Sequence, residues 1–371
     1  MLGLMGGSQV TNPWEGRSQR AVDEARTARR AEARRRRYRR RRGLALAAVA
    51  AVVAIVAVAA LGSGSSRPRL KTNARTGAPA ASHASVAIRV VPAGTLPAPV
   101  QFPAAAALGD GRVVVLGGLD SSESSTAAIT TLSGGRSMPS GALPVPQHDA
   151  QAATLANAVF LFGGGAVESY DHILRFDPAT AQVTQAGRLP QPASDVAVAS
   201  IGDTAYVVGG YNGTSALDTI VSWSPGGSAR VVARLPTALR YAAAASVDGR
   251  VIIAGGSREE TPEDEILSFD PATGAVVRIG HLPAPLTHAT AATLGSTVYV
   301  VGGRGGSSGS QTATVLAIDS RSGLVRLAGR LPLGISDAAA VATQGAIVAA
   351  GGRAAAGPQA GVFRLQAVAA P

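Results

Sequence analysis

The sequence predicts an all-β fold in which six similar blades close into a β-propeller, and three observations lead to this prediction. A pair of glycines recurs six times at intervals of 46, 46, 46, 47 and 49 residues, which is a repeat length typical of propeller blades. Each repeat divides into short β-rich segments separated by turn residues, and no helical periodicity interrupts them. The pairs are Gly117-Gly118, Gly163-Gly164, Gly209-Gly210, Gly255-Gly256, Gly302-Gly303 and Gly351-Gly352.

The repeat that begins at Leu235 shows its four expected strands clearly. Residues 242–246 (AAAAS) form the first strand, and a turn leads to the second strand at 250–256 (RVIIAGG). A polar loop precedes the third strand at 265–270 (EILSFD), and a PATG turn leads to the fourth at 275–280 (AVVRIG). Turn residues lie where β-hairpins need them. The glycine pair ends the second strand, where positive φ lets the backbone turn sharply.

The two ends of the repeat region predict how the ring closes. The last repeat has segments for three strands, at 338–342, 346–350 and 362–365, but the chain ends before a fourth. Residues 86–97 (VAIRVVPAGTLP) match the fourth-strand pattern AVVRIGHLP of the repeat described above. We therefore expect 86–91 to complete the last blade as an N-terminal strand. This strand would hold the ring without a disulfide, because the sequence has no cysteine.

Two further features recur around the double glycines. An aromatic residue stands a few positions before the pair in three repeats, at Phe160, Tyr206 and Tyr299, and a DPATG hairpin at 270–274 returns in altered form at 177–181 and 319–323. These repeats resemble kelch repeats of the galactose-oxidase-like propeller superfamily. The resemblance covers residues 86–371 and implies a six-bladed kelch-type β-propeller. One departure is that the tryptophan usual in the outer part of a kelch blade is missing, and Trp223 lies on a third strand instead.

Charge divides the chain into a basic N-terminal part and a nearly neutral remainder. Residues 1–84 hold 17 Lys and Arg against 4 Asp and Glu, a net charge of +13, whereas 85–371 hold 17 basic and 19 acidic groups, a net charge of −2. We interpret 1–42 as an Arg-rich cytoplasmic tail, 43–62 as a transmembrane helix that precedes the propeller, and 63–85 as a flexible linker. The basic balance is therefore no evidence that the propeller binds nucleic acid.

The transmembrane interpretation rests on twenty uncharged, almost wholly apolar residues at 43–62, which as a helix span about 30 Å. The arginine excess before this segment predicts a single-pass protein of the cell membrane, with its N-terminus cytoplasmic and its propeller extracytoplasmic. The arginines are expected to meet anionic lipid headgroups, and no nucleic-acid partner is expected. A cleaved signal peptide, including one of the twin-arginine kind, is the alternative.

The loops at one end of the first strands form the best candidate binding site. First strands line the channel of a propeller, and here they offer Gln151, Thr154, Thr290 and Thr293 but no acid, base or cation, so catalysis inside the channel is not expected. One set of polar residues precedes the first strands and another follows the glycine pairs, and antiparallel pairing places both sets on one face. This candidate rim comprises His148, Asp149, Asp195, Tyr211, Arg240, Tyr241, His288, Arg304, Asp337 and Arg353.

The carboxylates of the rim allow more than one interpretation. Asp149, Asp195 and Asp337 occupy one repeat position, where a short side chain often accepts backbone N–H bonds in a loop. A metal site formed by His288, Asp149 and Asp195 is a weaker alternative. No catalytic residue, cofactor or metal is assigned.

The arginines of the rim suit a different role. Arg240, Arg304 and Arg353 have no acidic neighbour in sequence, and a guanidinium pairs bidentately with carboxylate or phosphate. Salt bridges to the three rim aspartates are the alternative. The acidic residues between 259 and 265 are expected to form a solvated surface, because they lack the spacing of a Ca²⁺ loop.

These features favour a non-enzymatic binding or scaffold module for an envelope protein or a glycan. The alternative is a sugar enzyme, because the resemblance extends to bacterial six-bladed kelch proteins that epimerise or mutarotate acidic sugars. The rim arginines would then hold the sugar and His288 would protonate it. Galactose oxidase activity is disfavoured, since its Tyr–Cys cofactor needs a cysteine. Regulation across the membrane is a third hypothesis, and its output would need another protein.

Overall fold

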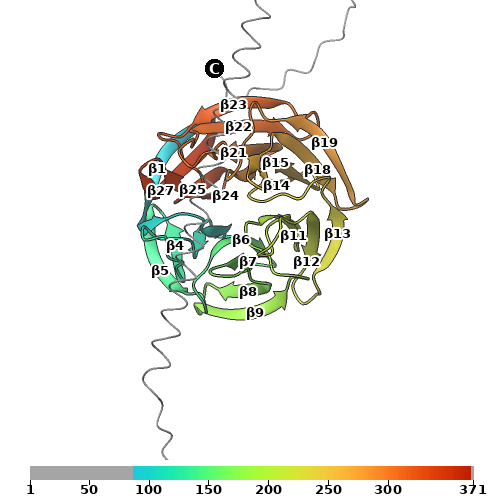
Figure 1. Cartoon of the computed structure of the whole chain (residues 1–371). Coiled ribbons are helices and arrows are strands. Elements are labelled where there is room, and N and C mark those ends of the chain that lie inside the picture. The colour runs from blue at the N-terminus through green and yellow to red at the C-terminus, as the bar shows by residue number, and fades with distance from the viewer. Residues whose placement is uncertain (1–86, 369–371) are drawn as a thin grey trace, which may run out of the picture. The chain divides into compact units, whose positions relative to one another are not determined.

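The computed structural model describes residues 87–368, which form β-strands arranged as six blades around a central channel (Figure 1). The expected cytoplasmic tail, transmembrane helix and linker lie outside this range. Among residues 87–368, no helix has the length and apolar character that crossing a membrane requires. The all-β six-bladed propeller expected from the repeats is confirmed.

Five blades each consist of four antiparallel strands that pair in the order in which they occur along the chain. The first two blades are β2 (Ala104–Ala107), β3 (Val113–Leu116), β4 (Ala128–Ser133) and β5 (Arg136–Ala142), then β6 (His148–Leu155), β7 (Ala158–Gly165), β8 (His172–Asp177) and β9 (Gln182–Arg188). The third blade is β10 (Ala197–Ile201), β11 (Thr204–Val208), β12 (Thr219–Trp223) and β13 (Arg230–Arg234).

The fourth blade is β14 (Ala243–Val247), β15 (Arg250–Ala254), β18 (Glu265–Asp270) and β19 (Ala275–His281), and it carries a small hairpin, β16 (Ser257–Arg258) and β17 (Thr261–Pro262). The fifth blade is β20 (Thr290–Leu294), β21 (Thr297–Val301), β22 (Thr314–Asp319) and β23 (Val325–Arg330). The strands of the fourth blade agree with the expected segments to within two residues at each end.

The sixth blade contains both ends of the domain. Its strands are β24 (Ala339–Thr343), β25 (Ala346–Ala350), the short β26 (Arg353–Ala354), β27 (Gly357–Val368) and the N-terminal strand β1 (Ala87–Val100). β1 pairs antiparallel with β27 from Ala87↔Val368 to Val100↔Gln359, and Figure 1 shows the cyan β1 beside the red β27. Closure by an N-terminal strand is therefore confirmed. The strand is longer than expected, because two irregularities, at Pro92/Gly94 and Thr95/Val100, let it continue.

The hydrophobic core lies between adjacent blades. First strands are rich in alanine because the blades converge toward the axis, and larger side chains fill the wider space further out. Trp223 of β12, for example, is buried against Phe160 and Phe162 of the preceding blade, at ring-centroid distances of 5.0 and 5.7 Å. Edge-to-face aromatic pairs of this kind stabilise a core beyond the area they bury.

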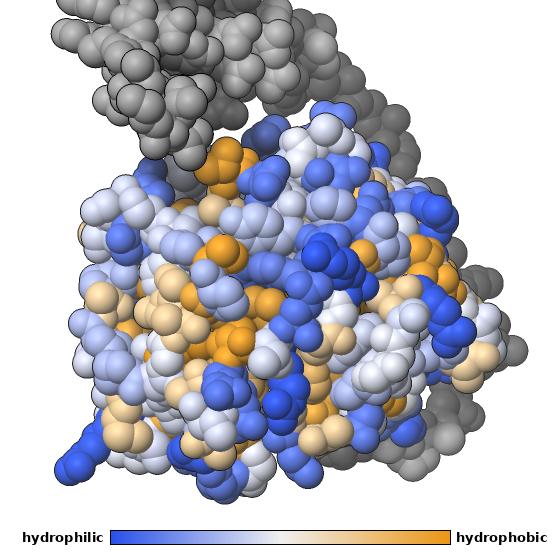
Figure 2. All heavy atoms as spheres, turned by 90° about the horizontal axis from the view of Figure 1, so that it is seen from below, coloured by the Kyte–Doolittle hydropathy of each residue, from blue (hydrophilic) through white to orange (hydrophobic). Residues whose placement is uncertain are grey.

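The fourth strands form the outer surface and are mostly exposed. Single apolar side chains such as Val277 of β19 and Leu327 of β23 stand among polar ones there. Figure 2 shows this mixture of polar and apolar residues on one side of the domain. Scattered exposed apolar residues are ordinary on a protein surface, so they indicate no docking site by themselves.

Each double glycine joins its blade to the next. The N–H of Gly164 donates to the carbonyl of Ala193 at 2.8 Å, and the equivalent glycine of every other blade makes the same bond. In the last blade the acceptor is the carbonyl of Val100, at the end of β1, so the N-terminal strand also supplies this link. A Cβ on Gly163 (φ 60°) would overlap the Ala193 carbonyl, which explains the glycine at this position.

Candidate functional site

Six residues at equivalent positions, one per blade, form a ring at one end of the channel. Their φ values lie between 53° and 60°, and the N–H of each donates to the carbonyl of the equivalent residue one blade earlier, at 2.8 to 3.4 Å. The bond from the N–H of Phe102 to the carbonyl of Asp337 closes the circle. The members of this ring are Phe102, Asp149, Asp195, Tyr241, His288 and Asp337.

The second set of expected rim residues lies beside this ring. Isolated β-bridges join Ser194 to Tyr211, Thr287 to Arg304 and Ser336 to Arg353, and two more blades have the same pairing. In the second blade His148 pairs with Gly165. The prediction that the two sets share one face of the propeller is therefore confirmed.

Three aromatic side chains of the ring lie against one another and line both of the cavities at this end of the channel. Tyr241 and His288 stack with their ring centroids 3.7 Å apart. The ring centroid of Phe102, from the first blade, lies 6.1 Å from that of Tyr241 and 6.0 Å from that of His288. We call these three residues the aromatic plug. Phe102 belongs to the set that precedes the first strands but was not among the ten candidate residues, because nothing in the sequence indicated its contact with the aromatic rings of two other blades.

His288 is neutral and its tautomer is defined by its neighbours. Arg304 Nη2 lies 3.0 Å from His288 Nε2, and since a guanidinium only donates, Nε2 must accept. The proton is then on Nδ1, which lies 3.0 Å from the Thr287 hydroxyl. Burial, together with the charges of Arg304 and Arg240, lowers the pKa of His288 to about 2. The enzyme alternative gains no support, because Nε2 has no proton to give to a sugar.

One of the expected arginine–aspartate salt bridges is present across a blade boundary. Arg240 Nε donates to Asp195 Oδ2 at 2.6 Å, and the guanidinium lies 4.1 Å from the ring centroid of Tyr211. Burial alone would lower the pKa of Arg240, but Asp195 and Tyr241 outweigh it, so the pKa is raised. Arg240 is thus a fixed positive charge.

The other two ring carboxyls hold protons more firmly than aspartate usually does. Burial, reinforced by the charges of Asp195 and Asp337, raises the pKa of Asp149 well above its ordinary value. Burial raises the pKa of Asp337 to about 6, although the Ser336 hydroxyl donates to Asp337 Oδ2 at 2.6 Å. Within residues 87–368 the three ring carboxylates accept no backbone N–H, so that interpretation was wrong. The peptide ring satisfies the loop N–H groups instead.

The remaining candidate residues do not converge on one point. Arg353 donates to Gln101 Oε1 at 3.1 Å and lies 3.6 Å from a Glu123 carboxylate oxygen. His148 Nδ1 is 2.9 Å from the Ser125 hydroxyl, and burial lowers the pKa of His148 despite the opposing charge of Asp195. These two residues therefore belong to the rim but not to a shared site.

A cavity of about 290 Å³, here called the outer pocket, brings together part of the rim. It is lined by the aromatic plug, by Arg240 and Arg304, and by Glu259 and Glu260 at the tip of the β16–β17 hairpin. Both glutamates are exposed, as expected for the acidic residues of this loop. The β16–β17 hairpin places them beside the two arginines, and nothing in the sequence predicted this position.

Residues 192–228, which include β10, β11 and β12, match the family model of the kelch motif. This repeat therefore carries a kelch motif, and the domain as a whole is a six-bladed β-propeller. Its fold is similar to the solved structure of YjhT, with a TM-score of 0.64 and 14% sequence identity over 72% of this chain and 95% of that one. No curated protein gives a significant match. At this identity the likeness concerns the fold alone.

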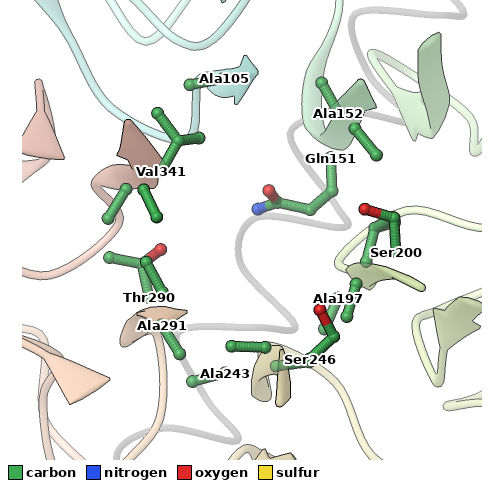
Figure 3. Close-up of a pocket in the computed structure, with 18 of the residues that line it drawn as sticks. Ala105, Gln151, Ala152, Ala197, Ser200, Ala243, Ser246, Thr290, Ala291 and Val341 are labelled. Carbon is green, nitrogen blue, oxygen red and sulfur yellow. The ribbon is translucent and has the colours of Figure 1, made fainter. Parts of the chain in front are cut away.

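The channel of the propeller has uncharged walls, as its sequence predicted. A cavity of about 450 Å³ is lined by the first strands, and its polar residues include the expected Gln151, Thr154, Thr290 and Thr293. Ser200 and Ser246 line it as well (Figure 3). The Gln151 side chain extends into the channel (Figure 3). The Thr293 hydroxyl donates to the Ser246 carbonyl of the preceding blade at 2.8 Å, so it serves blade packing.

The expected alternative of a metal site is not formed. Among residues 87–368, no group of three or more histidine, aspartate and glutamate side chains is placed to hold a metal ion. Asp195 faces the Arg240 guanidinium, and His288 Nε2 accepts from Arg304.

Replacing Asp149 with asparagine should stabilise the propeller measurably at pH 7.5, and by less at pH 4.5. The folded-state pKa is raised above 3.8, so the folded protein keeps a proton that the unfolded chain releases. The contribution of Asp149 to the free energy of unfolding therefore falls as the pH rises from about 4 toward the folded-state pKa of Asp149. Asparagine mimics the protonated carboxyl and tolerates the φ of 55°.

Urea denaturation of both proteins at the two pH values measures this effect. Asp195→Asn is the matched control and should destabilise the fold, because it leaves Arg240 without its carboxylate. A lower stability of Asp149→Asn at both pH values would contradict the proposed protonation of Asp149.

Proposed function

We propose that the chain is a membrane-anchored, extracytoplasmic binding module that holds a carboxylate-bearing ligand in the outer pocket. The proposal rests on one observation, which is that the guanidinium of Arg304 has no carboxylate partner among residues 87–368. This half-buried guanidinium lines the pocket, and among residues 87–368 no carboxylate oxygen lies within 4.0 Å of it, whereas Arg240 and Arg353 each have one. A guanidinium partly removed from water and without an anion is a ready partner for a carboxylate.

Two contacts hold Arg304 in place for such a partner. Its Nη2 donates to His288 Nε2 at 3.0 Å, and its Nη1 is 3.5 Å from the Gly305 carbonyl. His288 is in turn stacked on Tyr241, so the acceptor of the guanidinium is itself held in place. Little side-chain freedom remains to be lost on binding, which favours affinity.

The rest of the pocket limits which anions fit. The plug offers aromatic surface on which a sugar ring or an apolar side chain can pack. Glu259 and Glu260 line the same pocket and repel a ligand with several negative charges. The pocket therefore suits a ligand with a single carboxylate, carried by a glycan or by a segment of an envelope protein.

The anchor belongs to the proposal as the sequence predicts it. The apolar segment 43–62 would hold the module in the membrane, the Arg-rich tail would meet anionic headgroups, and residues 63–85 would tether the propeller. Protease added to intact cells should then digest the propeller, and protection of its C-terminus would refute this orientation.

Arg304→Ala should weaken binding of a carboxylate ligand about 10- to 100-fold, as expected for loss of a charge-assisted pair. D-glucuronate is a suitable probe and D-glucose its uncharged counterpart, measured by thermal shift and by calorimetry on the full chain. A ligand at 100 times its Kd adds about 2.7 kcal/mol to the folded state, which is easily detected.

Arg353→Ala is the matched control, because Arg353 holds the same repeat position but is paired with Glu123 and does not line the outer pocket. It should leave binding unchanged. Equal losses in both variants, or equal binding of glucuronate and glucose, would refute Arg304 as the anion site.

A further inference from the structure

A second, smaller cavity lies on the inner side of the aromatic plug. This inner cavity has a volume of about 40 Å³ and is lined by all six residues of the peptide ring. It shares Gln151, Ala242 and Ala289 with the channel, so the two spaces adjoin. Since one water needs about 10–15 Å³ of such volume, the inner cavity has room for an ammonium-sized group.

The inner cavity is lined by carboxyl groups and by no basic side chain except neutral His288. Asp149, Asp195 and Asp337 all line it, and neither an arginine nor a lysine does. Asp195 is paired with Arg240 outside the cavity. The arrangement excludes anions and leaves the other two carboxyls as potential acceptors.

In the part of the chain that the structure describes, Asp337 Oδ1 is the ring carboxyl oxygen that lacks a hydrogen bond, whereas Oδ2 of the same residue accepts from the Ser336 hydroxyl. Its side chain is 2% exposed, and its Oδ1 is buried without a hydrogen bond among residues 87–368. The nearest ring nitrogen, His288 Nε2 at 3.9 Å, already accepts from Arg304 and has no proton to offer. A buried carboxylate oxygen without a donor is costly, so this position favours a ligand that donates hydrogen bonds.

The channel adjoining this cavity suits a slim, uncharged chain. Its wall consists of alanine, valine, serine, threonine and glutamine side chains, with no charged residue among them. The alanine methyl groups offer apolar contact to methylene groups, and a volume of about 450 Å³ lies in the usual range of small-molecule sites. The wall is therefore complementary to an aliphatic stem rather than to a charged or planar ligand.

We propose that the channel binds a linear aliphatic amine, with its ammonium group in the inner cavity against Asp337 Oδ1 and its methylene chain along the alanines of the first strands. The ammonium supplies N–H donors, and Asp337 Oδ1 is a buried acceptor that has none among the described residues. The amine enters from the channel, on the other side of the aromatic plug from the outer pocket, so this site does not depend on the proposed carboxylate site.

Calorimetry on the full chain at pH 7.5 tests this proposal with 1,5-diaminopentane as the probe and 1,5-pentanediol as its uncharged equivalent. We expect saturable binding of the diamine and none of the diol. Asp337→Asn should weaken diamine binding at least ten-fold, and asparagine tolerates the φ of 60° at this position. Asp218→Asn removes a half-exposed carboxylate that directly precedes β12, is paired with Arg234 and lines neither cavity, so it should leave binding unchanged.

A second variant tests the route without touching the carboxyls. Ala342 is exposed and lines the channel, so Ala342→Phe should obstruct it and abolish diamine binding in a folded protein. Absence of diamine binding to the unaltered chain would overturn the proposal. So would equal binding of the diol, or diamine binding that survives both Asp337→Asn and Ala342→Phe.

Discussion

Deletion of residues 87–100 should abolish the cooperative unfolding transition of the propeller or lower its Tm by at least about 10 °C. These residues form β1, which supplies the last strand of the sixth blade. Ile88, Leu96 and Val100 of this strand are buried, and each such side chain contributes about 1.5–3 kcal/mol by burial. Together they approach the total stability of an ordinary domain.

The strand also connects three blades. Besides its ladder with β27, β1 contacts β5 of the first blade and β23 of the fifth. Its last residue, Val100, accepts the hydrogen bond from Gly352 that in every other blade goes to the loop before the next blade. Loss of β1 therefore opens the ring and exposes β27 as an unpaired edge.

The control is a chain that lacks residues 1–80, which precede the compact unit Ala81–Pro371. Its thermal transition, followed by circular dichroism, should match that of the full chain. A peptide covering 85–102, added to the shortened propeller, should restore stability in proportion to its concentration. A transition that does not change after loss of 87–100 would refute the role of β1 in ring closure.

Gly163→Ala should destabilise the propeller by more than about 3 kcal/mol, which is a large effect for one methyl group. The residue has a φ of 60°, which costs a non-glycine residue about 1–2 kcal/mol by itself. The new Cβ would also overlap the Ala193 carbonyl, which accepts the hydrogen bond from Gly164 and joins two blades. The overlapping atom belongs to the backbone, so the clash cannot be relieved by the movement of a flexible side chain.

Gly202→Ala separates these two costs. Gly202 lies in the turn between β10 and β11 with a φ of 55°, and its added Cβ would meet no atom within 4 Å. It should cost only about 1–2 kcal/mol, the conformational part. Urea denaturation of both variants gives the difference. Equal destabilisation would show that the glycine pair is needed for its φ and not for the contact between blades.

Much of the fold could be predicted because each repeat specifies its own hairpins. The strands expected at 265–270 and 275–280 were found at Glu265–Asp270 and Ala275–His281. The full extent of β1 could not be predicted, because its second half pairs through irregularities near Gly94 and Thr95 that have no counterpart in the repeats. Local turn chemistry is repeated in the sequence, whereas the register of strands joined across the whole chain is not.

The sequence predicted where the rim residues lie, but not which hydrogen bonds and ion pairs they form. Antiparallel pairing was sufficient to place Arg304 and His288 on one face, but not to show that one donates to the other. The Arg240–Asp195 pair joins adjacent blades, 45 residues apart, and depends on the rotation between those blades. The left-handed backbone of Phe102 and Tyr241 had no signal, since such residues rarely adopt it.

The closed circle of peptide hydrogen bonds has a consequence for how this propeller can change. Main-chain groups join all six blades at the channel mouth whatever the side chain, and Phe, Asp, Tyr and His therefore occupy one equivalent position. The main-chain bonds that hold the blades together are thus separate from the side chains that can contact a ligand. The six side chains of this ring can be exchanged for others that tolerate positive φ, which would create new specificities without altering the peptide ring. This makes the mouth a natural starting point for engineering.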